Sequence, residues 1–140
     1  MDGAGIAAML DLGAEVAQLG TAFIGCPESD ADAGYRKALS SDAADHTIVT
    51  RAISGRPARC LRNSFTVLGS GAQEHQIPAY PIAYDAGKAL NAAAKLAQET
   101  GYGAQWAGQG APLARELPAA ELVRALVREL KQSTDQEKDR

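Results

Sequence analysis

The sequence predicts an α/β architecture made mostly of helices, with one buried strand and one further extended segment. Roughly a fifth of the 140 residues are alanine and only 5% are aromatic, which favours closely packed helices over a β-sandwich. The two strand-like segments are short and contain β-branched residues, and turn-forming residues bound them. At 46% hydrophobic and 22% charged, the chain has the composition of a folded globular domain.

Composition also excludes several classes of protein. There are 14 basic against 17 acidic residues, whereas a nucleic-acid-binding surface normally has a basic excess, so we expect no nucleic-acid partner. No apolar run approaches the roughly 20 residues that span a bilayer, and the first residues lack the basic region of a secretory signal. Cys26 and Cys60 cannot supply a disulfide scaffold or a four-ligand zinc site. We therefore expect a cytoplasmic protein without membrane association and with reduced thiols.

The chain opens with a predicted helix over residues 5–12. Its apolar residues, beginning with Ile6, recur at the i, i+3, i+4 spacing of an amphipathic helix. Asp2 is placed to cap the N-terminus of this helix, and Gly13 comes just after its C-terminus.

A buried strand is predicted next, over residues 16–19. Val16 and Leu19 are apolar, and the segment is short and lies between two glycines. A helix, a tight turn and a buried strand are the second half of a βαβ unit. The first strand of such a unit would precede Met1 and is missing from the sequence.

The middle of the chain is predicted to hold a helix, an extended segment and a shorter helix. Residues 29–41 begin with acidic and end with basic side chains, which matches a helix dipole. Residues 47–53 have high β propensity and end at a Ser-Gly-Arg-Pro turn signal, which indicates a short strand. Residues 59–65 suit a short helix, and residues 68–78 suit a polar loop.

Helices dominate the rest of the sequence. Residues 84–100 are rich in alanine and are predicted as a long helix that stops at Gly101. A short helix is expected near residues 111–116, a final amphipathic helix over 120–130, and a frayed, charged tail over 131–140. The predicted core comprises Ile6, Met9, Leu10, Val16, Leu19, Phe23, Ile48, Leu90, Leu96, Leu122, Val123, Leu126 and Leu130.

The most informative candidate site follows the predicted strand, at Gln18, Leu19, Gly20 and Thr21. Gly20 has no Cβ, so a ligand can approach the backbone closely there. Thr21 adds a hydroxyl donor and Gln18 an amide, and the following backbone N–H groups can bind an anion. The alternative is a strand that simply ends at a glycine, which is common.

Other polar residues carry weaker signals. Arg56 is followed closely by a second arginine, Arg59, and the pair could bind an anion, although loop arginines are usually solvated or paired with a carboxylate. Cys26 and Cys60 have no neighbouring basic cluster to activate a thiol. The two histidines of the chain lack partners at ligand spacing, so no metal site is predicted.

Several motifs together resemble the nitronate monooxygenase family, formerly called 2-nitropropane dioxygenases. The matching segments are DGAGIAA from residue 2, QLGTAF from 18, CPES from 26, SGRPAR from 54 and AGQG from 107. A further segment, ARELPAAEL from residue 114, is similar to the closing helix of the family. The resemblance extends over nearly the whole chain, to about Glu129, with the segments in the family's order. It implies an FMN-dependent TIM (β/α)8 barrel enzyme in which Gln18, Leu19, Gly20 and Thr21 contact the FMN phosphate.

The sequence also departs from the family pattern. The Gly-Gly-Ile strand end that precedes Asp-Gly-x-Gly in the family is absent before Met1, and the family's catalytic histidine has no counterpart. We therefore expect residues 1–130 to be a C-terminal fragment of such a barrel with its post-barrel helical region, followed by the charged tail over 131–140. No catalytic residue is assigned.

The function implied by the resemblance is FMN-dependent oxidation of alkyl nitronates by O₂ to carbonyl compounds and nitrite. The small-molecule substrate would be an alkyl nitronate, and activity should be impaired in this chain. One alternative is a related FMN barrel reductase of the enoyl-acyl carrier protein or NADH:quinone type. Another is a non-catalytic interaction module. Either a homo-oligomer or a complementing N-terminal chain would cover its unfinished strand.

Overall fold

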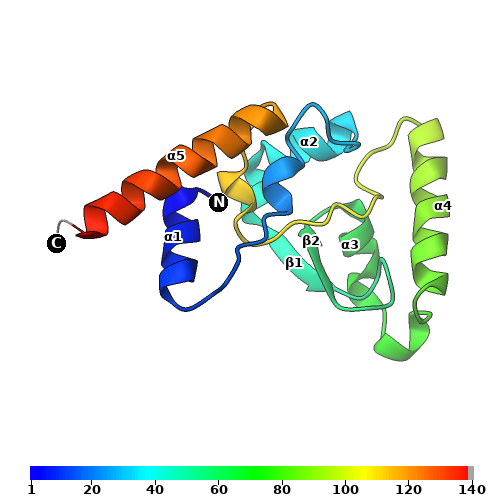
Figure 1. Cartoon of the computed structure of the whole chain (residues 1–140). Coiled ribbons are helices and arrows are strands. Elements are labelled where there is room, and N and C mark those ends of the chain that lie inside the picture. The colour runs from blue at the N-terminus through cyan, green and yellow to red at the C-terminus, as the bar shows by residue number, and fades with distance from the viewer. Residues whose placement is uncertain (139–140) are drawn as a thin grey trace. The chain divides into compact units, whose positions relative to one another are not determined.

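The computed structural model describes residues 1–138, with side chains up to Gln136, and divides them into two compact units (Figure 1). The first unit contains residues 1–31 and the chain from Leu113 onward. The second unit contains residues Asp32–Pro112. No described helix is both long enough and apolar enough to cross a membrane.

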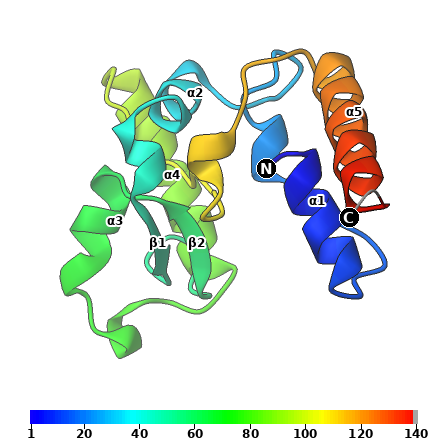
Figure 2. The ribbon, with the colours of Figure 1, turned by 90° about the vertical axis from the view of Figure 1, so that its left-hand side faces the viewer.

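The first unit is built from two helices, α1 (Gly3–Asp11) and α5 (Ala119–Lys138), and a 3-10 turn, η1 (Thr21–Phe23). The predicted first helix is confirmed, together with the predicted residues at its two ends, Asp2 and Gly13. The Asp2 side chain accepts a hydrogen bond from the Gly5 amide at 2.8 Å, and Gly13 follows the helix with φ +96°. Helix α1 packs on α5 (Figure 2). The core cluster of the unit comprises Ala22, Cys26, Leu122 and Leu126, with Met1, Ile6, Leu19, Phe23, Leu117 and Ala119 packed against it.

The buried strand predicted over residues 16–19 is wrong. These residues form neither a helix nor a strand, and the Val16 side chain is 80% exposed. A strand requires hydrogen bonds to a neighbouring strand, and the sheet that the described residues form contains only segments of the second unit. Apolar residues alone therefore did not make a strand here, because among the described residues no neighbouring strand lies beside this segment.

The second unit contains a two-stranded antiparallel sheet with short helices. Strand β1 (Thr47–Thr50) pairs with β2 (Ala58–Leu61), and Thr47 lies opposite Leu61 (Figure 2). Buried Ile53, Cys60 and Phe65 form its core cluster. The helical elements of this unit are α2 (Ala33–Leu39), η2 (Asp42–Asp45), α3 (Ser64–Leu68), η3 (Gly69–Gly71), η4 (Glu74–Gln76), α4 (Ile82–Leu96) and η5 (Ala111–Leu113), the last of which ends in the first unit.

The structure confirms some predicted elements of this unit and corrects others. Helix α2 lies within the predicted range and is capped by the Asp32 side chain. The extended segment over 47–53 is confirmed as a strand only to Thr50. The helix predicted over 59–65 is wrong, because β2 occupies its first half and α3 begins only after Asn63, which closes a capping box.

The long helices also differ at their ends. Helix α4 ends at Leu96, and Gln98 with φ +60° terminates the turn, so the chain leaves the helix before Gly101. Helix α5 continues through Lys138, so the described part of the 131–140 tail is helical and not frayed, while residues 139 and 140 lie outside the described residues. The short helix expected near 111–116 is the single turn η5.

The predicted core is correct where a helix face is covered and wrong where it is open. Leu122 and Leu126 are buried, whereas Leu96 is 89% exposed at the end of α4. Periodicity identifies the apolar face of a helix, but only tertiary packing decides whether that face is covered. The other predicted core residues that are exposed are Met9, Leu10, Val16, Ile48 and Val123.

Candidate functional site

The segment Gln18–Thr21 of the first unit leads directly into the turn η1. Gln18 and Gly20 are exposed, while Leu19 and Thr21 are half-buried, and Leu19 packs against the core cluster. Gly20 precedes η1, and its carbonyl accepts a hydrogen bond from the Phe23 amide at 3.1 Å. The first hydrogen bond of the turn therefore ends at the carbonyl of Gly20.

The space beside Gly20 suits the close approach of a ligand. A Cβ at this position would meet no atom within 4 Å, and Gly20 lines a hollow of about 380 Å³. Both oxygens of the Glu28 carboxylate, which also lines the hollow, accept from the Ala119 amide at 3.1 Å at the start of α5. The donors that the corner offers are neutral amide and hydroxyl groups, and such groups bind phosphate well. Of the four corner residues Gly20 is the one that lines this hollow, so the open space beside Gly20 and the neutral donors of the corner are what suit a phosphate, while the Glu28 carboxylate opposes its charge.

A carboxylate–guanidinium pair holds the start of α1 on α5. Arg115 Nη1 lies 2.6 Å from Glu129 Oε1, and the Gly3 amide donates to Glu129 Oε2 at 2.9 Å. Arg115 also donates to the Met1 carbonyl at 3.3 Å. The Arg115 guanidinium and the Gly3 amide hold the pKa of the Glu129 carboxyl below its usual range. The loop that precedes α1 is thereby fixed on the first unit.

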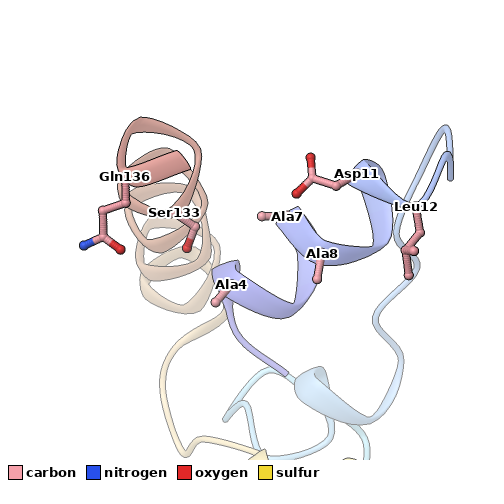
Figure 3. Close-up of a pocket in the computed structure, with 7 residues that line it drawn as sticks. All are labelled: Ala4, Ala7, Ala8, Asp11, Leu12, Ser133 and Gln136. Carbon is pink, nitrogen blue, oxygen red and sulfur yellow. The ribbon is translucent and has the colours of Figure 1, made fainter. Parts of the chain in front are cut away.

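A larger hollow, of about 510 Å³, lies between α1 and α5 (Figure 3). Asp11 is the only ionisable side chain among the residues that line it. The rest are Ala4, Ala7, Ala8, Leu12, Ser133 and Gln136. This set contains no cluster of converging donors, so we assign no binding site to it.

The cysteines and histidines contribute no reactive centre. Burial raises the pKa of Cys60 to about 11, and burial together with the nearby Glu28 raises the pKa of Cys26. Both thiols therefore stay protonated near neutral pH and are poor nucleophiles. His46 and His75 are exposed, and within the described part of the chain no three metal-binding side chains gather.

Arg56 and Arg59, which the sequence suggested as an anion-binding pair, make different contacts in the structure. Arg59 lies in β2 and donates to the Thr47 hydroxyl at 3.1 Å, so it braces the sheet. Arg56 is exposed, and its guanidinium carbon lies 4.6 Å from the centre of the Tyr80 ring. Arg56 is therefore the one of the two that is available to a ligand.

Arg56 belongs to a group of aromatic and basic side chains in the second unit, the aromatic–cation cluster, that sequence reasoning missed. The Tyr80 and Tyr84 rings stack with centres 6.2 Å apart, and the Trp106 ring lies 6.5 Å from Tyr84. Lys88 Nζ lies 4.9 Å from the centre of the Tyr84 ring. The cluster comprises Arg56, Tyr80, Tyr84, Lys88 and Trp106.

One sequence signal could have found part of this cluster. Tyr84 and Lys88 are four residues apart on α4, which places their side chains on one face of the helix, and Tyr80 lies just before the helix. Lys88 is paired with Asp85 at 2.7 Å, and this carboxylate raises the pKa of the lysine. The positive charge of Lys88 is partly neutralised by Asp85, so Arg56 is the better candidate in the cluster for binding an anion.

A family model described as nitronate monooxygenase matches residues 1–129 of the 140. The chain belongs to the nitronate monooxygenase family. A curated nitronate monooxygenase from Paraburkholderia phytofirmans is 65% identical over 97% of the chain, and one from Pseudomonas aeruginosa is 53% identical over 94%. The chain spans 37% of the length of each of these relatives. The resemblance read from the sequence motifs is thus confirmed.

Solved structures define the fold of this nitronate monooxygenase family chain. Nitroalkane oxidase from Streptomyces ansochromogenes matches 97% of the chain with a TM-score of 0.85 and 42% identity, and the chain covers 38% of it. FabK from Thermotoga maritima matches 99% with a TM-score of 0.73 and 27% identity, and the chain covers 44% of it. Both are TIM-barrel flavoenzymes. The predicted fold class, a mostly helical piece of such a barrel with one or two strands, is confirmed.

Proposed function

We propose that a protein containing this chain uses FMN and O₂ to oxidise alkyl nitronates to carbonyl compounds and nitrite. The observation that carries the proposal is the family match over residues 1–129. The open corner at Gly20 supports it, because that corner is where the family resemblance puts the FMN phosphate.

Each residue of the corner would contribute differently to binding the phosphate. Gly20 allows the phosphate oxygens to reach the backbone, and Thr21 and Gln18 supply hydroxyl and amide donors. Leu19 anchors the corner in the core cluster, so the donors keep their positions. When bound, the flavin ring accepts the electrons of the oxidation, and the protein contributes binding and orientation.

The aromatic–cation cluster suits the nitronate. A nitronate is a planar anion whose charge is shared by two oxygens, and a guanidinium matches such a group with two parallel donors. Arg56 presents this donor pair at the surface, and its stacking on Tyr80 restricts the orientation of the guanidinium. We assign Arg56 to anion binding within the second unit, with its guanidinium oriented by the Tyr80 ring.

The isolated chain should bind FMN weakly and turn over little nitronate. It carries only one of the two phosphate-binding segments that the resemblance implies, and no catalytic residue is assigned to it. We expect the purified chain to be colourless, or to lose added FMN on gel filtration, and to consume no O₂ with the nitronate of 2-nitropropane.

An oxygen electrode and the flavin absorbance of the eluted protein check this expectation. Stoichiometric yellow colour with nitronate-dependent O₂ uptake would contradict it. Oxidation of NADH by the flavin-loaded chain without any nitronate would favour the reductase alternative.

A further inference from the structure

The buried side chain of Gln105, in the second unit, has an amide nitrogen without a hydrogen-bond partner. The residue is only 7% exposed, and its Oε1 accepts a hydrogen bond from Asn63 Nδ2 at 3.0 Å. Among the described residues no group accepts a hydrogen bond from Gln105 Nε2. In that part of the chain no buried side-chain nitrogen or oxygen is sealed from solvent without a partner, so Nε2 faces open space.

Asn63 fixes which end of the Gln105 amide faces that space. Asn63 is the N-cap of α3, and its Oδ1 accepts a hydrogen bond from the Thr66 amide at 3.0 Å. The other end of the same side chain, Nδ2, therefore lies toward Gln105, and it also donates to the Gly103 carbonyl at 3.1 Å. A donor must meet an acceptor, so Oε1 of Gln105 lies toward Asn63 and the free end of the Gln105 amide is a donor.

The open space is a cavity of about 170 Å³ that Gln105 lines together with residues of α2 and α4. Asn91 of α4 also lines it and is half-buried, and no described residue forms a hydrogen bond with its side chain. The Asn91 amide lies against Gly103, where a Cβ would come within 3.1 Å of Asn91 Oδ1. At about 30 Å³ for each water, the cavity has room for a small organic molecule.

The charged groups that line the cavity are exposed, and two of them neutralise each other. Lys95 Nζ lies 2.7 Å from Asp32 Oδ2, and both side chains are about half exposed. Glu99, the other charged residue of the lining, is exposed. An anion would meet a lysine that is already paired, and exposed carboxylates in water attract a cation only weakly. The buried part of the lining, with its neutral amides, therefore decides what fits.

We propose that this cavity binds a small neutral polyol. A hydroxyl group both accepts and donates a hydrogen bond, so it can accept from Gln105 Nε2 and donate to Asn91 Oδ1. Tyr35 adds an acceptor to the lining, because its hydroxyl donates to the Trp106 carbonyl and keeps its lone pairs free for a ligand. The inference concerns the second unit alone and does not depend on the proposed oxidation of nitronates.

An NMR titration of the full isotope-labelled chain tests the proposal. The side-chain NH₂ groups of Asn91 and Gln105 give signals of their own, so the readout comes from the lining itself. The probes are glycerol, acetate and methylammonium, which are all small and differ in charge. We expect glycerol to shift both side-chain signals and to saturate the shift, and we expect the two ions to leave the signals in place.

A substitution on α4 shows whether the bound molecule lies in this cavity. Asn91→Ala removes one amide of the lining without removing a hydrogen bond of the described chain. Alanine also favours a helix, so the variant should unfold at the temperature of the original chain or slightly above it. Its affinity for glycerol should fall about tenfold, which is the effect of losing one hydrogen bond. Ala92→Ser is the control, because Ala92 is exposed on the same helix and does not line the cavity, and this variant should bind glycerol like the original chain.

Other outcomes would overturn the inference. A shift that grows in proportion to the glycerol concentration without saturating would be a solvent effect and would leave the cavity to water. A saturable response to acetate or methylammonium as strong as the response to glycerol would assign the cavity to an ion. An unchanged affinity of Asn91→Ala for glycerol would place the bound molecule elsewhere on the chain.

Discussion

Replacing Gly55 by alanine is expected to destabilise the Asp32–Pro112 unit by about 3 kcal/mol and to disrupt the contact between Arg56 and Tyr80. Gly55 has φ +78°, a conformation that costs an alanine about 1–2 kcal/mol. A Cβ there would also lie 2.5 Å from the Pro78 carbonyl oxygen and 2.7 Å from the Tyr80 amide nitrogen. Both obstacles are backbone atoms, so the turn itself must move.

The single tryptophan makes this prediction measurable. Trp106 is the only tryptophan of the chain and belongs to the aromatic–cation cluster, so its fluorescence during urea unfolding reports on the second unit. Gly71→Ala is the matched control, because a Cβ at Gly71 would meet nothing within 4 Å, and its stability should change by less than about 0.5 kcal/mol. Equal urea midpoints for the two variants would show that the Gly55 turn is not tightly packed.

Replacing Gly3 by alanine is expected to cost the first unit about 3 kcal/mol or more. A Cβ at Gly3 would overlap the Leu130 amide nitrogen and the Glu129 carbonyl carbon, which are backbone atoms of α5. Helix α1 would have to move away from α5, and the hydrogen bond from the Gly3 amide to the Glu129 carboxylate would be lost. The expected result is loss of the packing between the two helices.

Amide exchange and far-ultraviolet circular dichroism measure this loss, because Trp106 lies in the other unit. The control lies in the same helix: at Gly5 a Cβ would meet only the tip of the Asp2 side chain, at 3.2 Å. Gly5→Ala should change stability by less than about 1 kcal/mol, since alanine also favours the helix. A Gly3→Ala chain as stable as Gly5→Ala would contradict the close packing of α1 on α5.

Local signals explain what could be predicted of the fold. Asp2 and Gly13 bound α1, and Asp32 caps α2, because each acts on backbone groups within a few residues of itself. A strand forms only where a partner strand pairs with it, as β1 does with β2, and residues 16–19 have no such partner among the described residues. Short segments of this kind carry too few residues for periodicity to separate strand from helix.

The residues of the candidate sites also differ in how far the sequence alone could predict them. The corner at Gly20 is contiguous in the sequence, so its residue types could suggest an anion-binding corner, and the family resemblance assigned that corner to the FMN phosphate. The aromatic–cation cluster joins Arg56, Tyr80 and Trp106, which lie far apart in the chain and meet only through the fold. Only the four-residue spacing from Tyr80 to Lys88 is visible in the sequence, and Tyr80 lies before α4, so that spacing alone does not predict the cluster.

The most direct test of the phosphate site compares FMN with riboflavin, which lacks the phosphate, in an NMR titration of the isotope-labelled chain. At millimolar ligand even weak binding moves the amide signals of the groups that it touches. We expect FMN and inorganic phosphate to shift the amides of Leu19, Gly20 and Thr21, and riboflavin to leave them in place. Shifts of these amides by riboflavin as large as those by FMN, or no response of Gly20 to FMN, would contradict the assignment of this corner to the flavin phosphate.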